Sequence, residues 1–264
     1  MKKIPDGLIY LIIVLALFGH AKFKAYRIDA PLPPPELGPI LPEESPNDSL
    51  VRVNVHKAVS SLGTAFSVDE NGNWLTARHV VDGCTNIGLN LGGSQVLRVE
   101  SEVSSVADIA LLSADWSRKP LVGDLKDARQ IGEYGYFFGY PQGRPGEVVG
   151  ALLGRNRLMV RGRYSSDESI LAWTEIGRTR GLKGSLGGLS GGPGLDKDGE
   201  VIGIVTAESP RRGRVYTVAP RNLKGLIDEN PGNMAKPIAL NTYGLHADSF
   251  RRERRIAQVV CVVD

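Results

Sequence analysis

The chain of 264 residues has the composition of a globular protein, with 42% hydrophobic and 23% charged residues. These proportions exclude an intrinsically disordered chain. The net charge of +3 at pH 7 is modest, and no aromatic residues are interleaved with the basic ones, so we expect no nucleic-acid partner.

The first 25 residues predict export. They begin MKKIPDGLIYLIIVLALF, a basic start followed by an unbroken apolar run. A cleaved signal peptide and a retained membrane anchor both fit this segment, but Lys22, Lys24 and Arg27 are poor neighbours for a cleavage site and favour the anchor. We therefore expect a single-pass protein of the inner membrane with its main domain in the periplasm or outside the cell. If the N-terminus is cleaved, the protein is secreted.

Residues 26–49 predict a linker, because the stretch APLPPPELGPILPEESPND is too rich in proline to join a core. From residue 50 onward, short apolar or alternating runs are broken by Gly, Asn and Asp. This texture predicts an all-β architecture, with a hairpin turn at 69–73. Besides an N-terminal hydrophobic helix, helices are expected only near the end, at 220–229 and 248–257.

One serine lies in a stretch that is unusually rich in glycine. Residues 188–207 read GLSGGPGLDKDGEVIGIVTA, with Ser190 among the first glycines. A nucleophilic serine needs an exposed hydroxyl and backbone amides aimed at the negative charge that develops on the attacked carbonyl. Small residues permit this close approach. Ser190 is therefore a candidate nucleophile.

Two upstream motifs supply its partners. His79 follows the strand-like WLTAR, and Asp108 opens the apolar run IALL. GxSxG alone also matches the nucleophile elbow of α/β-hydrolases, with Asp228 and His246 as the partners. We reject that interpretation because a helix must follow the elbow, and GGPG cannot start one smoothly.

Together these motifs resemble the chymotrypsin-like serine peptidases of the bacterial HtrA/Deg type. The similar stretches are GTAF, TARHV, DIALL, GLSGGP, VIGIVTA and VYTVAP, within residues 61–229. The resemblance implies two six-stranded antiparallel β-barrels with the site in the cleft between them. We expect the first barrel at 50–123, the second at 124–229 and a C-terminal extension at 230–264. Too few residues follow for the PDZ domain that the family commonly carries.

The resemblance also implies a role for each residue. Ser190 attacks the peptide carbonyl, His79 takes its proton and passes it to the leaving amine, and Asp108 orients the imidazole. The backbone amides of Gly188 and Ser190 would form the oxyanion hole. No cofactor is expected, and no metal either, because the sequence has no clustered His and Cys spacing.

The substrate is expected to bind as an extended polypeptide. By resemblance, Thr206, Ala207 and Glu208 form the strand edge that pairs with its backbone. The expected base of the specificity pocket has no acid, which favours small or medium apolar side chains. Leu189 stands where relatives have Asp or Asn, so substrate, a partner or assembly into an oligomer is expected to order the loop at 178–187.

The two cysteines are Cys84, five residues after His79, and Cys261 in the C-terminal run QVVCVVD, which is a predicted strand. In an exported chain they can form a disulfide that ties the tail to the first barrel, or remain two separate thiols. The sequence leaves both alternatives open.

The sequence thus predicts an exported or membrane-anchored serine endopeptidase that cleaves polypeptides through an acyl-enzyme. Two rival hypotheses stand beside it. One is a catalytically silent pseudoprotease that binds peptides or serves as a scaffold. The other is an envelope adaptor that acts through its basic tail, residues 230–264.

Overall fold

The computed structural model describes residues 7, 10–11, 15, 36–92, 95–229 and 237–264. Except for residues 7, 10–11 and 15, the expected N-terminal anchor or signal therefore lies outside the described residues, as does the start of the expected linker. No helix in these described ranges has the length and apolar character needed to cross a membrane. Residues 35–264 form one unit by their internal contacts, and only this unit is considered below.

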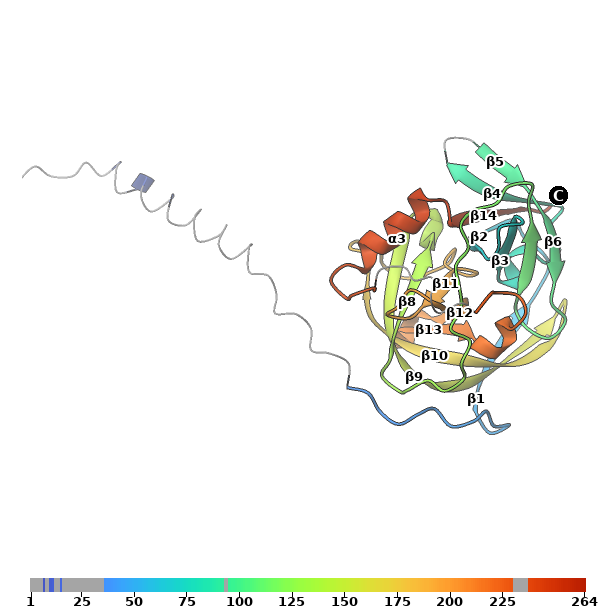
Figure 1. Cartoon of the computed structure of the whole chain (residues 1–264), viewed down its shortest axis with the longest axis horizontal. Coiled ribbons are helices and arrows are strands. Elements are labelled where there is room, and N and C mark those ends of the chain that lie inside the picture. The colour runs from blue at the N-terminus through green and yellow to red at the C-terminus, as the bar shows by residue number, and fades with distance from the viewer. Residues whose placement is uncertain (1–6, 8–9, 12–14, 16–35, 93–94, 230–236) are drawn as a thin grey trace, which may run out of the picture. The chain divides into compact units, whose positions relative to one another are not determined.

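The expected all-β class is confirmed (Figure 1). The strands are β1 (Ser49–Val55), β2 (Ser61–Ser67), β3 (Asn73–Thr76), β4 (Asn86–Gly92), β5 (Gln95–Arg98), β6 (Glu100–Val103), β7 (Ala110–Ser113), β8 (Tyr134–Gly139), β9 (Gly146–Gly162), β10 (Ser166–Arg178), β11 (Pro193–Leu195), β12 (Val201–Ser209), β13 (Arg214–Val218) and β14 (Ile256–Val262). The helical segments are α2 (Arg78–Val81), α3 (Tyr243–Arg252) and the 3-10 turns η1 (Pro141–Gly143), η2 (Pro210–Arg212) and η3 (Pro220–Leu223).

The second barrel is built from six strands in the order β9, β10, β13, β12, β11 and β8. The additional pairing of β8 with β9 closes the ring. A seventh strand, β1, joins its outer side in parallel with the second half of β9. This corrects the expected domain boundaries, which placed residues from 50 onward in the first barrel. Strand propensity alone does not decide which neighbour a strand pairs with.

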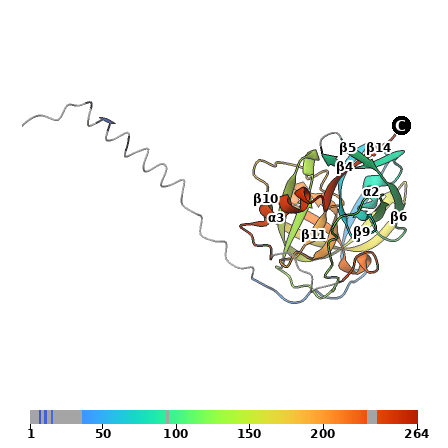
Figure 2. The same cartoon turned by 45° about the horizontal axis from the view of Figure 1, so that its top comes forward.

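The first barrel takes one of its strands from the far end of the chain. Its strand order is β5-β4-β14-β2-β3-β7-β6, and β14 pairs antiparallel with both β2 and β4. Two views show β14 beside β4 (Figure 1, Figure 2). The expected C-terminal extension is therefore part of the first barrel in its last residues. The strand expected in QVVCVVD is present as β14.

The helices differ from expectation. At 220–229 only the 3-10 turn η3 forms, because the backbone leaves helical geometry at Lys224, whose ψ is 130°, and Gly225 then takes a positive φ of 79°. The helix expected at 248–257 lies earlier, as α3, since Ile256 and the residues after it are buried in the β14 ladder. The hairpin turn at 69–73 is present. It is fixed by the Asp69 carboxylate, which accepts hydrogen bonds from the amides of Asn71 and Asn73.

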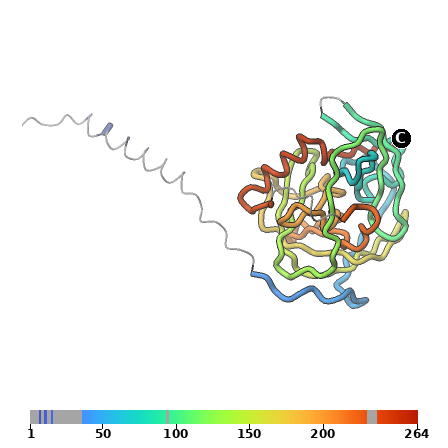
Figure 3. Tube along the Cα trace, in the orientation of Figure 1, coloured from blue at the N-terminus to red at the C-terminus, as the bar shows by residue number. Residues whose placement is uncertain are grey.

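The two barrels share one buried core. A single cluster of buried apolar side chains contains Phe66 and Leu75 of the first barrel together with Phe138 and Leu195 of the second. The Cα trace shows the cyan and green segments of the first barrel lying beside the yellow and orange segments of the second (Figure 3). Residues contributed by different barrels are thereby held at fixed positions along the cleft between them.

Candidate active site

His79 lies in the one-turn helix α2, directly after β3. Val80 and Val81 pack into the first-barrel core and anchor the turn, while the His79 side chain stays 31% exposed. Its Nδ1 lies 2.7 Å from Asp108 Oδ2, and its backbone N–H donates to Asp108 Oδ1 at 2.9 Å. The second ring nitrogen is thus available on the other side of the imidazole.

Asp108 is almost fully buried, with a side chain 2% exposed. Its carboxylate accepts hydrogen bonds from the backbone and ring of His79 and from the hydroxyl of Thr206. Burial by itself raises the pKa of Asp108, but the charge and hydrogen bonds of these neighbours outweigh it and lower the pKa. For His79, burial lowers the pKa and Asp108 more than compensates, so the imidazole pKa lies above its ordinary value.

Thr206 reaches Asp108 because β12 is irregular at this point. Val205 pairs with Thr217 and Ala207 with Tyr216, so Thr206 is the extra residue of a β-bulge. A bulge turns a side chain out of the regular alternation. The Thr206 side chain therefore supports the carboxylate, a role that the sequence did not reveal.

Ser190 lies in the turn before β11, and both barrels hold its backbone. Its carbonyl accepts the Thr64 N–H from the first barrel at 2.9 Å, and the next amide, Gly191 N–H, donates to Val205 O in the second. Gly191 has a φ of +85°, and a Cβ there would lie 2.2 Å from the Thr64 carbonyl oxygen. Glycine is therefore required where the nucleophile turn crosses β2.

Two amides beside Ser190 remain free. Leu189 O accepts Gly192 N–H, and Gly187 O accepts Gln142 N–H. Because the N–H and C=O of a trans peptide point in opposite directions, the amides of Ser190 and Gly188 face away from these partners. Neither amide donates to any acceptor within the described part of the chain. This pair of free donors is the arrangement that an oxyanion hole requires.

The loop before the nucleophile is ordered by contacts within the chain. Gln142, in η1, has a φ of +56° and donates through Nε2 to the carbonyls of Lys183 (2.6 Å) and Ser185 (2.8 Å). Glu208 accepts the Leu186 N–H at 2.7 Å and the Ser185 hydroxyl. Sequence reasoning missed Gln142, since PQG reads as an ordinary turn.

Leu189 occupies the position at which the similar peptidases have Asp or Asn. It is completely buried and packs in the second-barrel cluster with Phe137 and Trp173. An apolar contact thus fixes the residue before the nucleophile. The three residues expected at the substrate edge have different contacts. Thr206 donates to Asp108, Glu208 accepts hydrogen bonds from the loop before Ser190, and Ala207 lines the cleft.

The residues of the site line one cleft of about 620 Å³. His79, Asp108 and Ser190 line it, and so do Gly188 and Ala207. Apolar side chains of β1 and the β9–β10 hairpin form another wall, namely Val53, Val55, Leu158, Val160 and Tyr164. This arrangement combines a hydroxyl, an imidazole–carboxylate pair and two free amides, which are the groups needed for acyl transfer.

A family model described as a trypsin-like peptidase domain matches residues 63–204, which is more than half of the chain. The chain belongs to the trypsin-like peptidase family.

Curated relatives of the HtrA/DegP kind are similar over part of their length. A probable periplasmic serine endoprotease DegP-like from Halomonas elongata is 30% identical over 157 residues, covering 58% of this chain and 31% of that protein. A protein of the same description from Rickettsia conorii is 28% identical over 211 residues, covering 74% and 38%. The chain spans only about a third of the length of these relatives.

The fold is shared with a solved peptidase. The active form of the Rv3671c protease from M. tuberculosis has a TM-score of 0.51 at 17% identity, covering 68% of this chain and 83% of that one. This likeness concerns the fold.

This trypsin-like domain carries a disulfide between Cys84 and Cys261, with a Cα–Cα distance of 5.6 Å. Of the two alternatives that the sequence left open, the structure has the bridge. Cys84 lies three residues after the end of α2, and Cys261 lies in β14. The bridge therefore ties the inserted strand to the segment that follows His79.

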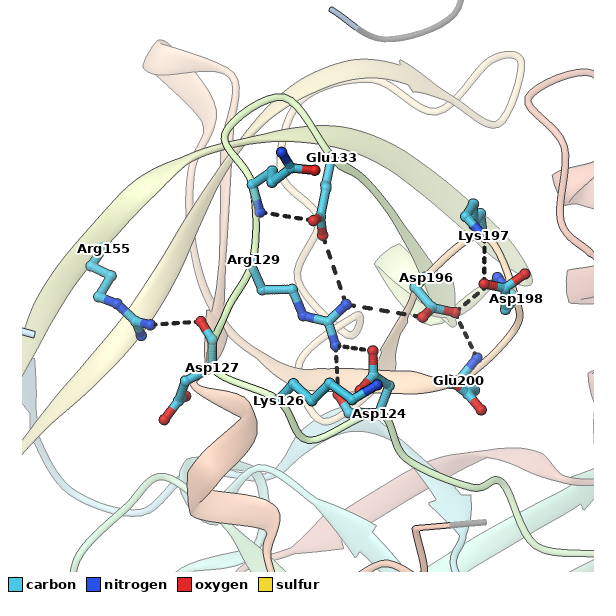
Figure 4. A network of polar contacts seen from close by, with 11 residues as sticks. Asp124, Lys126, Asp127, Arg129, Glu133, Arg155, Asp196, Lys197, Asp198 and Glu200 are labelled. Carbon is cyan, nitrogen blue, oxygen red and sulfur yellow. Dashed lines mark hydrogen bonds and ion pairs between the residues drawn. The ribbon is translucent and has the colours of Figure 1, made fainter. Parts of the chain in front are cut away.

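A separate polar network lies at the β11–β12 turn of the trypsin-like domain (Figure 4). Asp124, Asp196 and Glu200 bring carboxylate oxygens within 4.8 Å of one another. Arg129 partly offsets the charge of this cluster, with Nη2 2.9 Å from Asp124 and Nη1 4.0 Å from Asp196. None of these residues lines the cleft with Ser190. We interpret the network as a structural element of the second barrel.

Proposed function

We propose that this chain is a serine endopeptidase that hydrolyses peptide bonds through an acyl-enzyme. The observation that supports the proposal best is the convergence of His79, Asp108 and Ser190 on one cleft, beside two amides that have no acceptor among the described residues. Membership of the trypsin-like family agrees with it.

In the proposed mechanism the Ser190 Oγ bonds to the substrate carbonyl carbon while its proton moves to the free nitrogen of His79. Negative charge develops on the carbonyl oxygen, which the Gly188 and Ser190 amides stabilise. The peptide C–N bond then breaks, and the imidazolium returns its proton to the leaving amine. Water repeats the sequence on the ester, releasing the acid and free Ser190. Asp108 stays ionised and stabilises the imidazolium throughout.

We further propose that the substrate is an extended polypeptide. Ala207 of β12 lines the cleft, where its strand can pair with an extended chain, and the apolar wall formed by β1 and the β9–β10 hairpin favours apolar side chains on the acyl side of the cleaved bond. Cleavage profiling with a peptide library checks this. A preference for acidic or basic residues at every acyl-side position would contradict it.

The decisive experiment for the activity is labelling with a fluorophosphonate probe, which reacts with an activated serine. We expect wild-type protein to label and to cleave unfolded casein, and the variants Ser190→Ala and His79→Ala to do neither. Ser101→Ala, at an exposed serine of β6 away from the cleft, is the control. A pseudoprotease would leave wild-type Ser190 unlabelled even with a substrate-like peptide present.

We also propose that the domain works in the cell envelope, tethered by the N-terminal segment. The N-terminal sequence, the periplasmic description of the relatives and the Cys84–Cys261 disulfide support this location, because disulfides persist in oxidising compartments. An alkaline phosphatase fusion after residue 50 tests it, since that reporter is active only outside the cytoplasm. A phosphatase-negative fusion would contradict export.

A further inference from the structure

A second carboxyl group lies behind the triad acid. Glu168, in β10 of the second barrel, is 6% exposed, and its Oε1 accepts the backbone N–H of Asp108 at 2.7 Å. Its other oxygen has a weaker contact with Asn222 Nδ2 at 3.5 Å. Glu168 therefore holds the main chain of Asp108, while His79 and Thr206 hold its side chain.

The hairpin that carries Glu168 also contacts the histidine helix. At its tip, Arg163 donates to the Asp82 carboxylate at 2.7 Å and to the Asp82 carbonyl at 2.6 Å. The guanidinium of Arg78 lies 3.9 Å from the ring centre of Tyr164. The β9–β10 hairpin thus holds both sides of the His79–Asp108 pair, although the pair belongs to the other barrel.

The protonation state of Glu168 explains why a glutamate can lie buried behind Asp108. Burial and the charge of Asp108 raise the pKa of Glu168 to about 8, so the carboxyl is neutral at pH 7 and adds no second negative charge behind the triad. The groove on its outer side is lined by Glu44, Asp48 and the ion pair of Arg157 with Asp167. A neutral carboxyl keeps its acceptor oxygen for the Asp108 amide.

We propose that Glu168 is a positioning residue that fixes the main chain of Asp108, and through it the orientation of His79. The proposal rests on the proposed peptidase activity. It adds that the second barrel controls the geometry of an acid and base located in the first. An apolar residue at 168 would leave the buried Asp108 amide without an acceptor, and Asp108 would lose its fixed distance to the imidazole.

Three variants test the proposal. Glu168→Gln keeps an acceptor oxygen and has no proton to lose, Glu168→Leu has similar volume and no acceptor, and Asp167→Asn is the exposed neighbour on the same strand. We expect Glu168→Leu to lower kcat about tenfold or more with KM changed less than twofold. Glu168→Gln and Asp167→Asn should stay within about threefold of the wild type in kcat at pH 7.

The pH profile gives a readout that a merely structural role would not change. Wild-type kcat should show a step near the ionisation of Glu168 that Glu168→Gln lacks, and this comparison suffices if Glu168→Leu does not fold. Wild-type kcat in Glu168→Leu, or a Glu168→Gln variant impaired as strongly as Glu168→Leu, would overturn the proposal. Failure of the peptidase proposal is seen separately, as wild-type protein that the fluorophosphonate does not label.

Discussion

In the proposed mechanism the imidazole of His79 acts as a base only when it is neutral, so its raised pKa sets the acid limit of the proposed activity. We expect kcat/KM to fall as the pH drops through a midpoint above the ordinary histidine value of about 6.5. Asp108→Asn removes the charge that raises the pKa. The midpoint should then move to lower pH, and kcat should drop by on the order of 10⁴. An unchanged midpoint in Asp108→Asn would show that the pair is not coupled in solution.

Two glycines with similar φ values distinguish the cost of a steric clash from the cost of a positive φ. Gly191 and Gly181 have φ values of +85° and +89°, but a Cβ has nothing within 4 Å at Gly181 and meets the Thr64 carbonyl at Gly191. We expect Gly181→Ala to cost about 1 kcal/mol of unfolding free energy. Gly191→Ala should cost about 2 to 4 kcal/mol because the clash adds to the strain. Urea denaturation measures both, and equal costs would refute the packing argument.

At the scale of elements, the loop at 183–187 owes its order to Gln142 in a neighbouring turn. Gln142→Ala removes the two side-chain hydrogen bonds to this loop and keeps the backbone one to Gly187. Each is worth about 1 kcal/mol, so kcat/KM and the fluorophosphonate labelling rate should fall about three- to tenfold.

Gln142→Gly distinguishes the lost contacts from backbone strain, because glycine adopts the same positive φ freely. Lys183→Ala is the matched control, since its backbone carbonyl stays in place. Full activity in both Gln142 variants would show that the free amides of Gly188 and Ser190 do not depend on this turn.

How far the sequence predicts the site depends on whether a contact is local. His79, Asp108 and Ser190 lie in motifs of a few residues, and the structure brings them to one cleft. Thr206, Gln142 and Glu168 act through a bulge, a strained turn and the register of a long hairpin. These features arise from tertiary pairing, and no local pattern marks them.

The same difference between local pattern and tertiary pairing applies to the fold. The alternating runs identify strands and the all-β class, because the side-chain period is a local property. The partners of β1 and β14 are decided by which sheet edge is open, which the sequence of either strand does not encode. The helix expected at 220–229 failed for a local reason, the non-helical backbone of Lys224 and Gly225.

At the scale of the whole molecule, the disulfide joins residues 177 positions apart. In the chain-entropy model a loop of this length contributes up to about 5 kcal/mol, and 2 to 4 kcal/mol is typical. We expect the double variant Cys84→Ser, Cys261→Ser to unfold at lower urea concentration by that amount. Reductant should destabilise the wild type and leave the double variant unchanged. A wild type insensitive to reductant under unfolding conditions would contradict a formed bridge.

The insertion of β14 between β2 and β4 has a consequence for the order of events during biosynthesis. The barrel that carries His79 and Asp108 is open along one seam until residues 256–262 have left the ribosome and, for an exported chain, crossed the membrane. A nascent chain short of that point has Ser190 but no closed scaffold for its base. The proposed peptidase activity therefore requires translation to have passed this strand.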